Sequence, residues 1–474
     1  MLVDLEKSVR VRMAPAPTGY LHIGTARTTL FNYLFAKHEK GKFILRIEDT
    51  DIERSSPEFE KDIIENLQWL GLKWDEGPFR QSERTSSYAK YLEKLIKNGA
   101  AYHCFCSEDE LEAKRQEQMS RGEAPKYNGK CKKLSEDEVK KYLAEGKPSI
   151  IRFKTPSKKV RFHDLIRGKL EFDSSLIGDF AIAKDLATPL YNFAVVIDDF
   201  EMKISHVIRG EDHIPNTPKQ ILLQEALGFP QPKYAHLPLI LGPDKSKLSK
   251  RHGAVAIADY RKDGYLPETL VNFMAFLGWN PDTEREIFAL PSLVKEFSLD
   301  KVQKSGAVFN IKRLDYLNGF YIRNKSLKRL TELCQPYLPE ADKEELKKIV
   351  AIYQERLKKL SEIRELTDFF FKDKLQYDKK LLRWKEMKDE EVSQFLDKLE
   401  NILYKIDSRD FNKENLEKVL MPEAEKIGDR GKLLWPLRVA LSGKEASAPP
   451  FEIAEILGKE KTLDRIKQAR ELVK

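Results

Sequence analysis

The fold of this chain is decided by residues 15–25, which read PAPTGYLHIGT. Residues 9–13, just before them, alternate apolar and basic side chains, which predicts a short strand. Residues 25–37 follow helical periodicity, and the apolar run at residues 43–47 predicts a second strand. Strand, turn, helix and strand form a βαβ unit, whose crossover predicts a parallel sheet covered by helices.

The turn at residues 15–25 suits a phosphate-bearing ligand. A helix N-terminus offers unpaired N–H groups and the positive end of its dipole to an anion. Gly24 would let an adenine approach the backbone, because no Cβ stands in the way. His22 could donate a hydrogen bond to a phosphate whose charge grows in a transition state. Taken alone, the same residues fit a proline-rich loop that caps an ordinary helix.

A second motif lies about 220 residues further on, at residues 242–253, and reads GPDKSKLSKRHG. Lys247 and Lys250 could neutralise a pyrophosphate released when an α-phosphate is attacked. A solvated basic loop is the alternative interpretation of such a charge run. The two motifs in this order are far more specific than either motif alone.

The C-terminal third has a different character. It contains no glycine between residues 321 and 427, and Lys, Glu and Leu recur at helical spacing. We therefore predict an all-helical domain over residues 325–474. One helix is expected to carry a single apolar face made of Leu346, Ile349, Val350, Tyr353, Leu357 and Leu360.

Composition limits the class of protein. The 474 residues are 41% hydrophobic and 34% charged, which is a globular balance, and the net charge of +8 permits a nucleic-acid partner without requiring one. No apolar run approaches the roughly 18 residues of a membrane span. Four cysteines do not make a disulfide framework, so a reducing, cytoplasmic setting is expected.

Several longer strings resemble a known family. Residues 247–251, KLSKR, and His22-Ile23-Gly24-Thr25 resemble the two signatures of class I aminoacyl-tRNA synthetases. The fuller strings APAPTGYLHIGTARTTLFNYLFA, FILRIEDTD and HVIRGEDHIPNTPKQ closely resemble glutamyl-tRNA synthetases of the bacterial type. The resemblance extends over nearly the whole chain.

This resemblance implies an α/β fold with a Rossmann-like class I catalytic domain, an inserted acceptor-binding domain and an all-α C-terminal anticodon-binding domain. The expected divisions are the two catalytic halves, the insertion between them with a metal site, a stem-contact region and the helical anticodon-binding domain. The first catalytic half is expected at residues 1–104, the insertion at 105–189 and the second catalytic half at 190–255. The stem-contact region is expected at 256–324 and the anticodon-binding domain at 325–474.

The resemblance also implies which residues bind glutamate. A glutamate pocket needs cations for the side-chain carboxylate, and arginine binds a carboxylate through two hydrogen bonds. Arg12 and Arg209 are expected to hold that carboxylate and Glu48 the amino group, while Tyr191 and Ala14 complete the pocket. Arg12, Arg209 and Glu48 would emerge at the carboxyl edge of the sheet, where doubly wound folds bind ligands. The alternative for each charged residue is a surface salt bridge.

The two signatures imply the ATP site. The catalytic residues are expected to be His22, Lys247 and Lys250, which stabilise the growing phosphate charge without a covalent nucleophile. The ATP-binding set consists of His22, Gly24, Thr25, Lys247, Ser249, Lys250 and Arg251.

Three cysteines and a tyrosine form a candidate zinc site. Cys104 and Cys106 are followed by Tyr127 and, after three further residues, by Cys131. A structural zinc needs four ligands in a tetrahedron, and thiolates are strong ones. The same Cys-x-Cys-x20-Tyr-x3-Cys spacing is seen in a truncated paralogue of the family. A set of free thiols that has lost its metal is the competing interpretation.

By resemblance, the expected activity is glutamate–tRNA ligation. ATP and Mg²⁺ would activate L-glutamate as glutamyl-adenylate, and the product would be transferred to the terminal adenosine of tRNA(Glu), or of both tRNA(Glu) and tRNA(Gln). A monomer that does not span a membrane is expected. The rivals are a glutaminyl-tRNA synthetase, whose C-terminal part is typically β-rich, and a catalytically dead RNA-binding homologue.

Overall fold

The computed structural model describes residues 8–51, 53–249, 251, 253 and 255–474. The chain divides into two compact units. The first comprises the chain up to Arg261 and the segment Pro267–Ile311. The second comprises Lys262–Leu266 and Lys312–Lys474.

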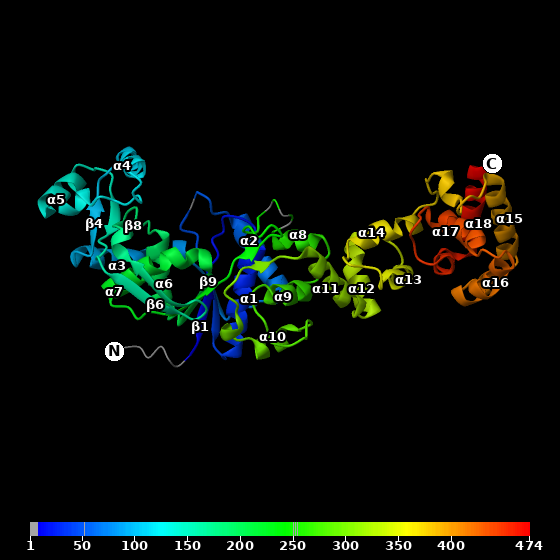
Figure 1. Ribbon diagram of the computed structural model, residues 1–474, viewed down its shortest axis with the longest axis horizontal. Coiled ribbons are helices and arrows are strands. Elements are labelled where there is room, and N and C mark those ends of the chain that lie inside the picture. The colour runs from blue at the N-terminus through cyan, green and yellow to red at the C-terminus, as the bar shows by residue number, and fades with distance from the viewer. Residues whose placement is uncertain (1–7, 52, 250, 252, 254) are drawn as a thin grey trace. The chain divides into compact units, whose positions relative to one another are not determined.

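A three-stranded parallel sheet opens the first unit and confirms the predicted βαβ unit. Its strand order is β1-β2-β3, and Arg12 of β1 stands opposite Ile44 of β2. Every residue of β2 after the first is buried, because helices cover the sheet (Figure 1). The elements are β1 (Arg10–Met13), α1 (Ile23–His38), β2 (Lys42–Ile47), α2 (Pro57–Trp69) and β3 (Glu76–Arg80).

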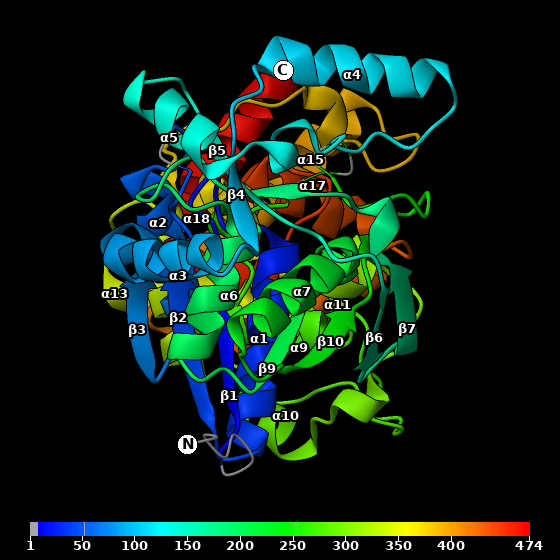
Figure 2. The same ribbon diagram turned by 90° about the vertical axis from the view of Figure 1, so that its left-hand side faces the viewer.

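A second sheet continues the first one beyond β1. Its strand order is β7-β6-β10-β9. The Ser205 N–H, just before β9, donates to the carbonyl oxygen of Arg10 at 2.9 Å, so β9 lies beside β1. Figure 2 shows the strands in the order β3, β2, β1, β9, β10, β6 and β7. The added strands are β6 (Lys159–Asp164), β7 (Gly168–Asp173), β9 (His206–Gly210) and β10 (Lys233–Leu237).

Helices pack on both sides of this sheet. Asn32 of α1 donates to the carbonyl oxygen of Ile208 in β9 at 3.0 Å. A separate apolar core joins Ile44 and Val207 of the sheet to side chains of three other helices. These are α3 (Thr85–Lys97), α6 (Tyr191–Glu201) and α7 (Thr217–Leu227).

Between α3 and α6 the chain forms a smaller antiparallel sheet of order β4-β5-β8. Two helices and a cluster of three cysteines, Cys104, Cys106 and Cys131, accompany this sheet. The elements are β4 (Ala101–Cys104), α4 (Glu108–Ser120), α5 (Glu136–Ala144), β5 (Ile150–Phe153) and β8 (Phe180–Ala183). After β10 the first unit ends with β11 (Ile240–Leu241), α8 (Ile257–Lys262), α9 (Pro267–Ala275), α10 (Leu290–Glu296) and β12 (Ala307–Val308).

The second unit is helical, as predicted for residues 325–474, all of which the structure describes. One continuous core of leucines, isoleucines and aromatic residues runs through it. The helices are α11 (Ile311–Arg323), α12 (Leu327–Cys334), α13 (Lys343–Tyr353), α14 (Glu362–Thr367), α15 (Asp389–Tyr404), α16 (Lys413–Lys426), α17 (Gly431–Ser442) and α18 (Pro450–Val473).

One detail of the helical prediction is wrong. The apolar face predicted for a single helix is buried, but α13 ends at Tyr353, so Leu357 and Leu360 lie beyond it. The side-chain amide of Gln354, the C-cap of α13, donates to the carbonyl oxygens of Ile322, Arg323 and Lys325. Within the described part of the chain, no helix is long and apolar enough to cross a membrane.

Candidate active site and metal centre

A cavity of about 380 Å³ opens at the carboxyl edge of the parallel sheet. It lies where β1, β2 and β9 end, beside the N-terminus of α1. Most of the residues predicted for ATP and glutamate line this one cavity: Arg12, Ala14, His22, Gly24, Thr25, Glu48, Tyr191, Arg209 and Lys247. Residues His206–Gly210 form β9, so Arg209 lies within this strand.

His22 is the N-cap of α1, and this role fixes its tautomer. Its Nδ1 accepts a hydrogen bond from the Gly24 N–H at 3.0 Å. A neutral imidazole that accepts at Nδ1 carries its proton on Nε2, which leaves an N–H donor for a ligand. Burial, with a smaller contribution from Lys247, lowers the pKa of His22 below 6.5, so the ring is neutral near pH 7. A Cβ added at Gly24 would stand 3.2 Å from Nδ1 of His22, so a glycine here gives that ring room.

Backbone hydrogen bonds bring the two signature motifs together. The Ile23 N–H donates to the carbonyl oxygen of Val255 and the Ile257 N–H to that of Leu21, both at 2.8 Å. These bonds fasten the segment after the KLSKR motif to the turn that carries His22. Two motifs about 220 residues apart in sequence therefore face one cavity.

The basic loop itself is a tight turn between Leu241 and Lys247. Lys247 reaches the cavity, and its Nζ lies 3.3 Å from an oxygen of Asp212. Ser249 and Arg251 do not line the cavity; Arg251 donates to the Ser246 hydroxyl at 2.6 Å. Lys250 lies outside the described residues.

Arg12 and Glu48 belong to a buried ion network. Arg12 Nε donates to Asp199 at 3.0 Å, and Arg46 bridges Asp199 at 2.8 Å and Glu48 at 3.1 Å. Both Arg12 and Glu48 are less than a tenth exposed, so neither forms the surface salt bridge considered as an alternative. Burial raises the pKa of Glu48 above 4.5, although Arg46 and Arg12 oppose the shift.

Arg209 is surrounded differently, because its partners are neutral. Its Nε donates to Nε2 of His236 at 3.2 Å, and its terminal nitrogens donate to Gln220 at 2.9 Å and Thr217 at 2.8 Å. Its guanidinium also lies 5.7 Å from the ring centre of Tyr234. Arg209 is only 5% exposed and has no carboxylate within ion-pair distance among the described residues. A buried cation without a counter-ion is costly, and a bound carboxylate would supply one.

The cavity is also lined by the aromatic residue Tyr191 and the cationic residue Arg27. The Tyr191 hydroxyl lies 3.0 Å from Nδ1 of His213, whose pKa is lowered to about 4 by burial and by Arg209. Arg27 of α1 is buried, and its Nη1 donates to the carbonyl oxygen of Leu277 at 3.0 Å. Burial lowers the pKa of Arg27 to about 10, so it still carries its charge at neutral pH.

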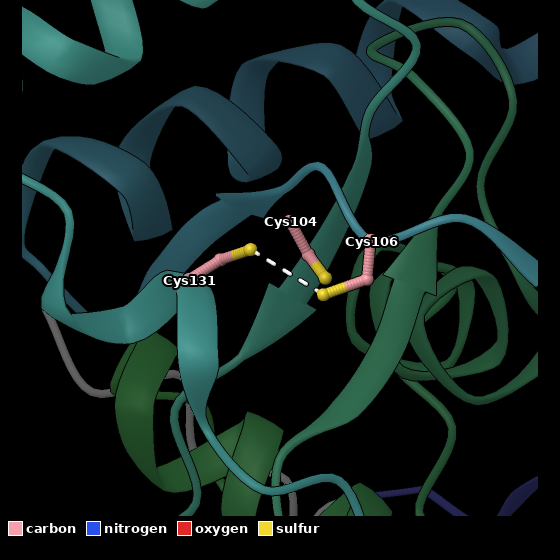
Figure 3. A group of neighbouring side chains, drawn as sticks. All are labelled: Cys104, Cys106 and Cys131. Carbon is pink, nitrogen blue, oxygen red and sulfur yellow. Dashed lines mark hydrogen bonds between the residues drawn. The ribbon is translucent and has the colours of Figure 1, made fainter. Parts of the chain in front are cut away.

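The predicted metal ligands converge at the end of β4 (Figure 3). The sulfurs of Cys104, Cys106 and Cys131 all lie within 4.8 Å of one another. The Tyr127 hydroxyl lies 3.4 Å from the first sulfur and 3.5 Å from the second, and the Cys106 and Cys131 sulfurs are 3.6 Å apart. A tetrahedral zinc with Zn–S bonds near 2.3 Å spaces its sulfurs by about 3.8 Å. The four groups therefore fit such an ion. Separately, the guanidinium of Arg152 lies 4.2 Å from the ring centre of Tyr127.

The predicted site residues are held in place by residues that were not predicted from the sequence. Asp198 and Asp199, on the apolar helix α6, anchor Arg46 and Arg12. Two adjacent acids in an otherwise apolar helix were a usable signal, because such a pair stays buried only with cationic partners. No sequence pattern around His236 indicated that it contacts a site residue.

Comparisons with known proteins agree over the whole chain. Residues 8–316 match the family described as "tRNA synthetases class I (E and Q), catalytic domain". Residues 329–470 match the "Anticodon binding domain" family.

Individual relatives are similar from end to end. A glutamate–tRNA ligase 1 from Caldicellulosiruptor saccharolyticus is 49% identical, and the match covers 97% of this chain and 98% of that protein. A glutamate–tRNA ligase from Bacillus subtilis is 42% identical, with 97% and 99% covered. A crystal structure of a glutamate tRNA ligase from Elizabethkingia meningosepticum, in complex with its amino acid, matches with a TM-score of 0.88 and 36% identity, covering 99% of this chain and 100% of that one.

Proposed function

The chain belongs to the class I aminoacyl-tRNA synthetases, as a glutamate–tRNA ligase, and we propose that the cavity at the edge of its parallel sheet activates L-glutamate with ATP. One observation carries this proposal. The cavity combines the phosphate-binding end of α1 with a buried arginine, Arg209, that lacks an anionic partner among the described residues.

Each substrate group has a complementary group in the cavity. The glutamate side-chain carboxylate is held by Arg209 and Arg12, and Glu48 pairs with the α-ammonium. The triphosphate lies over the N-terminus of α1, where the positive end of the helix dipole attracts anions. Magnesium would enter with ATP as the counter-ion of its phosphates.

The activation step is a phosphoryl-centre displacement. An oxygen of the glutamate α-carboxylate attacks the α-phosphorus, a new P–O bond forms, and the bond to the pyrophosphate oxygen breaks. Charge grows on the phosphate oxygens, and His22, through its Nε2–H, and Lys247 stabilise it together with Lys250. No proton has to be removed from the attacking carboxylate, so no general base is required.

The second step transfers the glutamyl group to tRNA. The 2′-hydroxyl of the terminal adenosine attacks the adenylate carbonyl and AMP leaves. In this proposal residues 105–189 hold the acceptor end, residues 256–324 contact the stem and the helical unit reads the anticodon, because specific RNA recognition targets unpaired bases. The enzyme acts as a cytoplasmic monomer, on tRNA(Glu) alone or on tRNA(Gln) as well.

ATP–pyrophosphate exchange tests the activation step. With tRNA present, L-glutamate should support exchange, while L-glutamine and L-aspartate should support it at least about a hundredfold less well. Glutamine lacks the charge that the buried arginine requires, and aspartate is one methylene too short to reach it. Equal exchange with glutamine, or none with glutamate, contradicts the proposed pocket.

Glutamate should bind more weakly as the solution is acidified. Glu48 must be ionised to pair with the α-ammonium, and burial raises its pKa above 4.5. A proton and the ligand then compete for the same carboxylate, so the apparent Kd rises as pH falls through that pKa. The loss therefore begins at a higher pH than it would for an exposed glutamate.

Calorimetric titration from about pH 8 to about pH 5 measures this dependence. The Glu48→Gln variant should bind glutamate weakly at every pH and lose most of the dependence. A wild-type Kd that is flat across the range, or a Glu48→Gln variant with the same slope, contradicts the assignment of Glu48.

We also propose that Cys104, Cys106, Cys131 and Tyr127 bind a structural zinc ion. The donor set and its spacings support this, and the backbone N–H of Cys131 donates to the Tyr127 hydroxyl at 2.9 Å, which orients that oxygen. The zinc would join β4 to the loop around Cys131. Free thiols remain the competing interpretation.

Replacing Cys131 with serine should lower the zinc content from about one ion per chain to a small fraction of that. Elemental analysis and a colorimetric zinc-release assay measure the change. Tyr127→Phe should retain the ion but release it faster to a chelator, because three thiolates remain. Cys334→Ser is the matched control, since Cys334 is buried in the helical unit far along the chain. Zinc-free wild-type protein would leave the free-thiol interpretation standing.

A further inference from the structure

A row of three buried side chains crosses the catalytic sheet and ends at Arg209. Asp164 lies on β6, His236 on β10 and Arg209 on β9, and these strands are neighbours. His236 stands directly opposite Arg209 in the parallel register. Asp164 and His236 are completely buried, and neither lines the cavity.

The contacts along this row fix the tautomer of His236. Asp164 lies 2.6 Å from Nδ1 of His236, and a carboxylate only accepts, so Nδ1 carries the proton. Nε2 is then a lone-pair acceptor, and it receives the Arg209 Nε–H at 3.2 Å. Burial lowers the pKa of His236 below 6.5, against the raising effect of Asp164, so the ring stays neutral near pH 7.

The neutral ring of His236 separates Asp164 from Arg209, so Asp164 does not compensate the charge of Arg209. Asp199 pairs directly with Arg12 and compensates its charge, whereas Asp164 is separated from Arg209 by a whole imidazole ring. His236, Gln220 and Thr217 occupy three of the five N–H donors of Arg209. One N–H on each terminal nitrogen remains, and among the described residues neither has an acceptor. A carboxylate can accept hydrogen bonds from two N–H groups of one guanidinium, and two such donors are left here.

We propose that Asp164 and His236 are positioning residues for glutamate: Asp164 holds His236 as a neutral acceptor, and His236 aims Arg209 without consuming its charge. The inference rests on the proposed role of Arg209 in binding the glutamate side chain. It predicts an effect on the affinity for the amino acid and not on the phosphate chemistry.

Two substitutions of His236 separate its two hydrogen bonds. Asparagine places an amide near the Nδ1 position, so His236→Asn retains a donor to Asp164 and removes the acceptor for Arg209. Glutamine places its amide near the Nε2 position, so His236→Gln retains an acceptor for Arg209. The KM for glutamate should rise about tenfold or more in His236→Asn and less than about threefold in His236→Gln, in line with the loss of one hydrogen bond to a charged group. The KM for ATP and kcat should stay within about twofold of wild type in both.

A merely structural histidine would behave differently. It would lower the melting temperature of both variants and change kcat and the KM for ATP as much as the KM for glutamate, and that result overturns the proposal. Arg209→Met in the same assay keeps the two proposals apart. If Arg209→Met leaves the KM for glutamate unchanged, the proposed glutamate pocket has failed. If Arg209→Met raises it and His236→Asn does not, only the positioning role has failed.

If both His236 variants fold poorly, the tautomer of His236 can be measured in the wild-type protein. Nitrogen-15 spectra of histidine-labelled protein, assigned by elimination with variants of the other histidines, report which ring nitrogen carries the proton. A proton on Nδ1 and a bare Nε2 near pH 7 support the proposal. A proton on Nε2, or on both nitrogens, overturns it, because Arg209 would then have no acceptor there.

Discussion

Replacing His22 with asparagine should lower kcat for glutamate activation by about a hundredfold to a thousandfold while the melting temperature stays close to wild type. The imidazole Nδ1 caps α1 by accepting from the Gly24 N–H, and His22 lines the cavity. In the proposed mechanism its Nε2–H donates to the phosphate in the transition state. Asparagine is a good N-cap, so it retains the cap. Its side chain is too short to donate to the phosphate.

The alanine variant completes this comparison. His22→Ala loses the cap as well, which should cost about 1 kcal/mol of stability in addition to the same loss of kcat. Pre-steady-state adenylate formation and thermal unfolding measure the two quantities separately. An asparagine variant with wild-type kcat would mean that His22 only caps the helix.

Replacing Arg209 with methionine should raise the KM for glutamate by about 30-fold to several thousandfold, which corresponds to about 2–5 kcal/mol. Arg209 is buried, and its partners among the described residues are neutral, so we propose that the glutamate carboxylate supplies its counter-ion. Methionine preserves much of the volume of the stem, and the Thr217 hydroxyl, 3.1 Å from His236, can donate to that ring when the guanidinium is gone. Stability should therefore change little, since an apolar side chain of similar size replaces a buried charge without loss.

The matched variant is Arg12→Met. Arg12 is compensated by Asp199, which also contacts Arg46 at 2.8 Å, so its removal should raise the KM for glutamate less than the removal of Arg209 does. Steady-state exchange at saturating ATP gives both constants. If Arg12→Met has the larger effect, the charge distribution described for this pocket is not what decides affinity.

The positions of the site residues could be predicted from sequence because they follow from topology. The strand before residues 15–25 and the strand after α1 are parallel neighbours, so Arg12 and Glu48 had to emerge at one edge. Their partners could not be predicted in this way. Asp199 is 187 residues from Arg12, and nothing in the local pattern of either segment relates them.

The position of Asp164 in the catalytic sheet could not be predicted from the sequence either. It lies in the stretch predicted as an insertion, yet β6 pairs with β10 and brings it into the catalytic sheet. Periodicity identifies a strand but not its neighbour in a sheet, since pairing depends on tertiary packing. The end of α13 at Tyr353 could not be predicted either, because the apolar period continues to Leu357 and Leu360, which are buried beyond the helix.

Aminoacylation measures whether this chain joins glutamate to tRNA. Purified tRNA(Glu) and tRNA(Gln) are offered separately with radiolabelled L-glutamate, ATP and magnesium, to the wild-type protein and to Lys250→Ala. We expect glutamate on tRNA(Glu) with the wild type and little or none with the variant; label on tRNA(Gln) as well would extend the range of tRNAs. Binding of either tRNA without transfer of glutamate to any would contradict this activity and identify an RNA-binding homologue that has lost its chemistry.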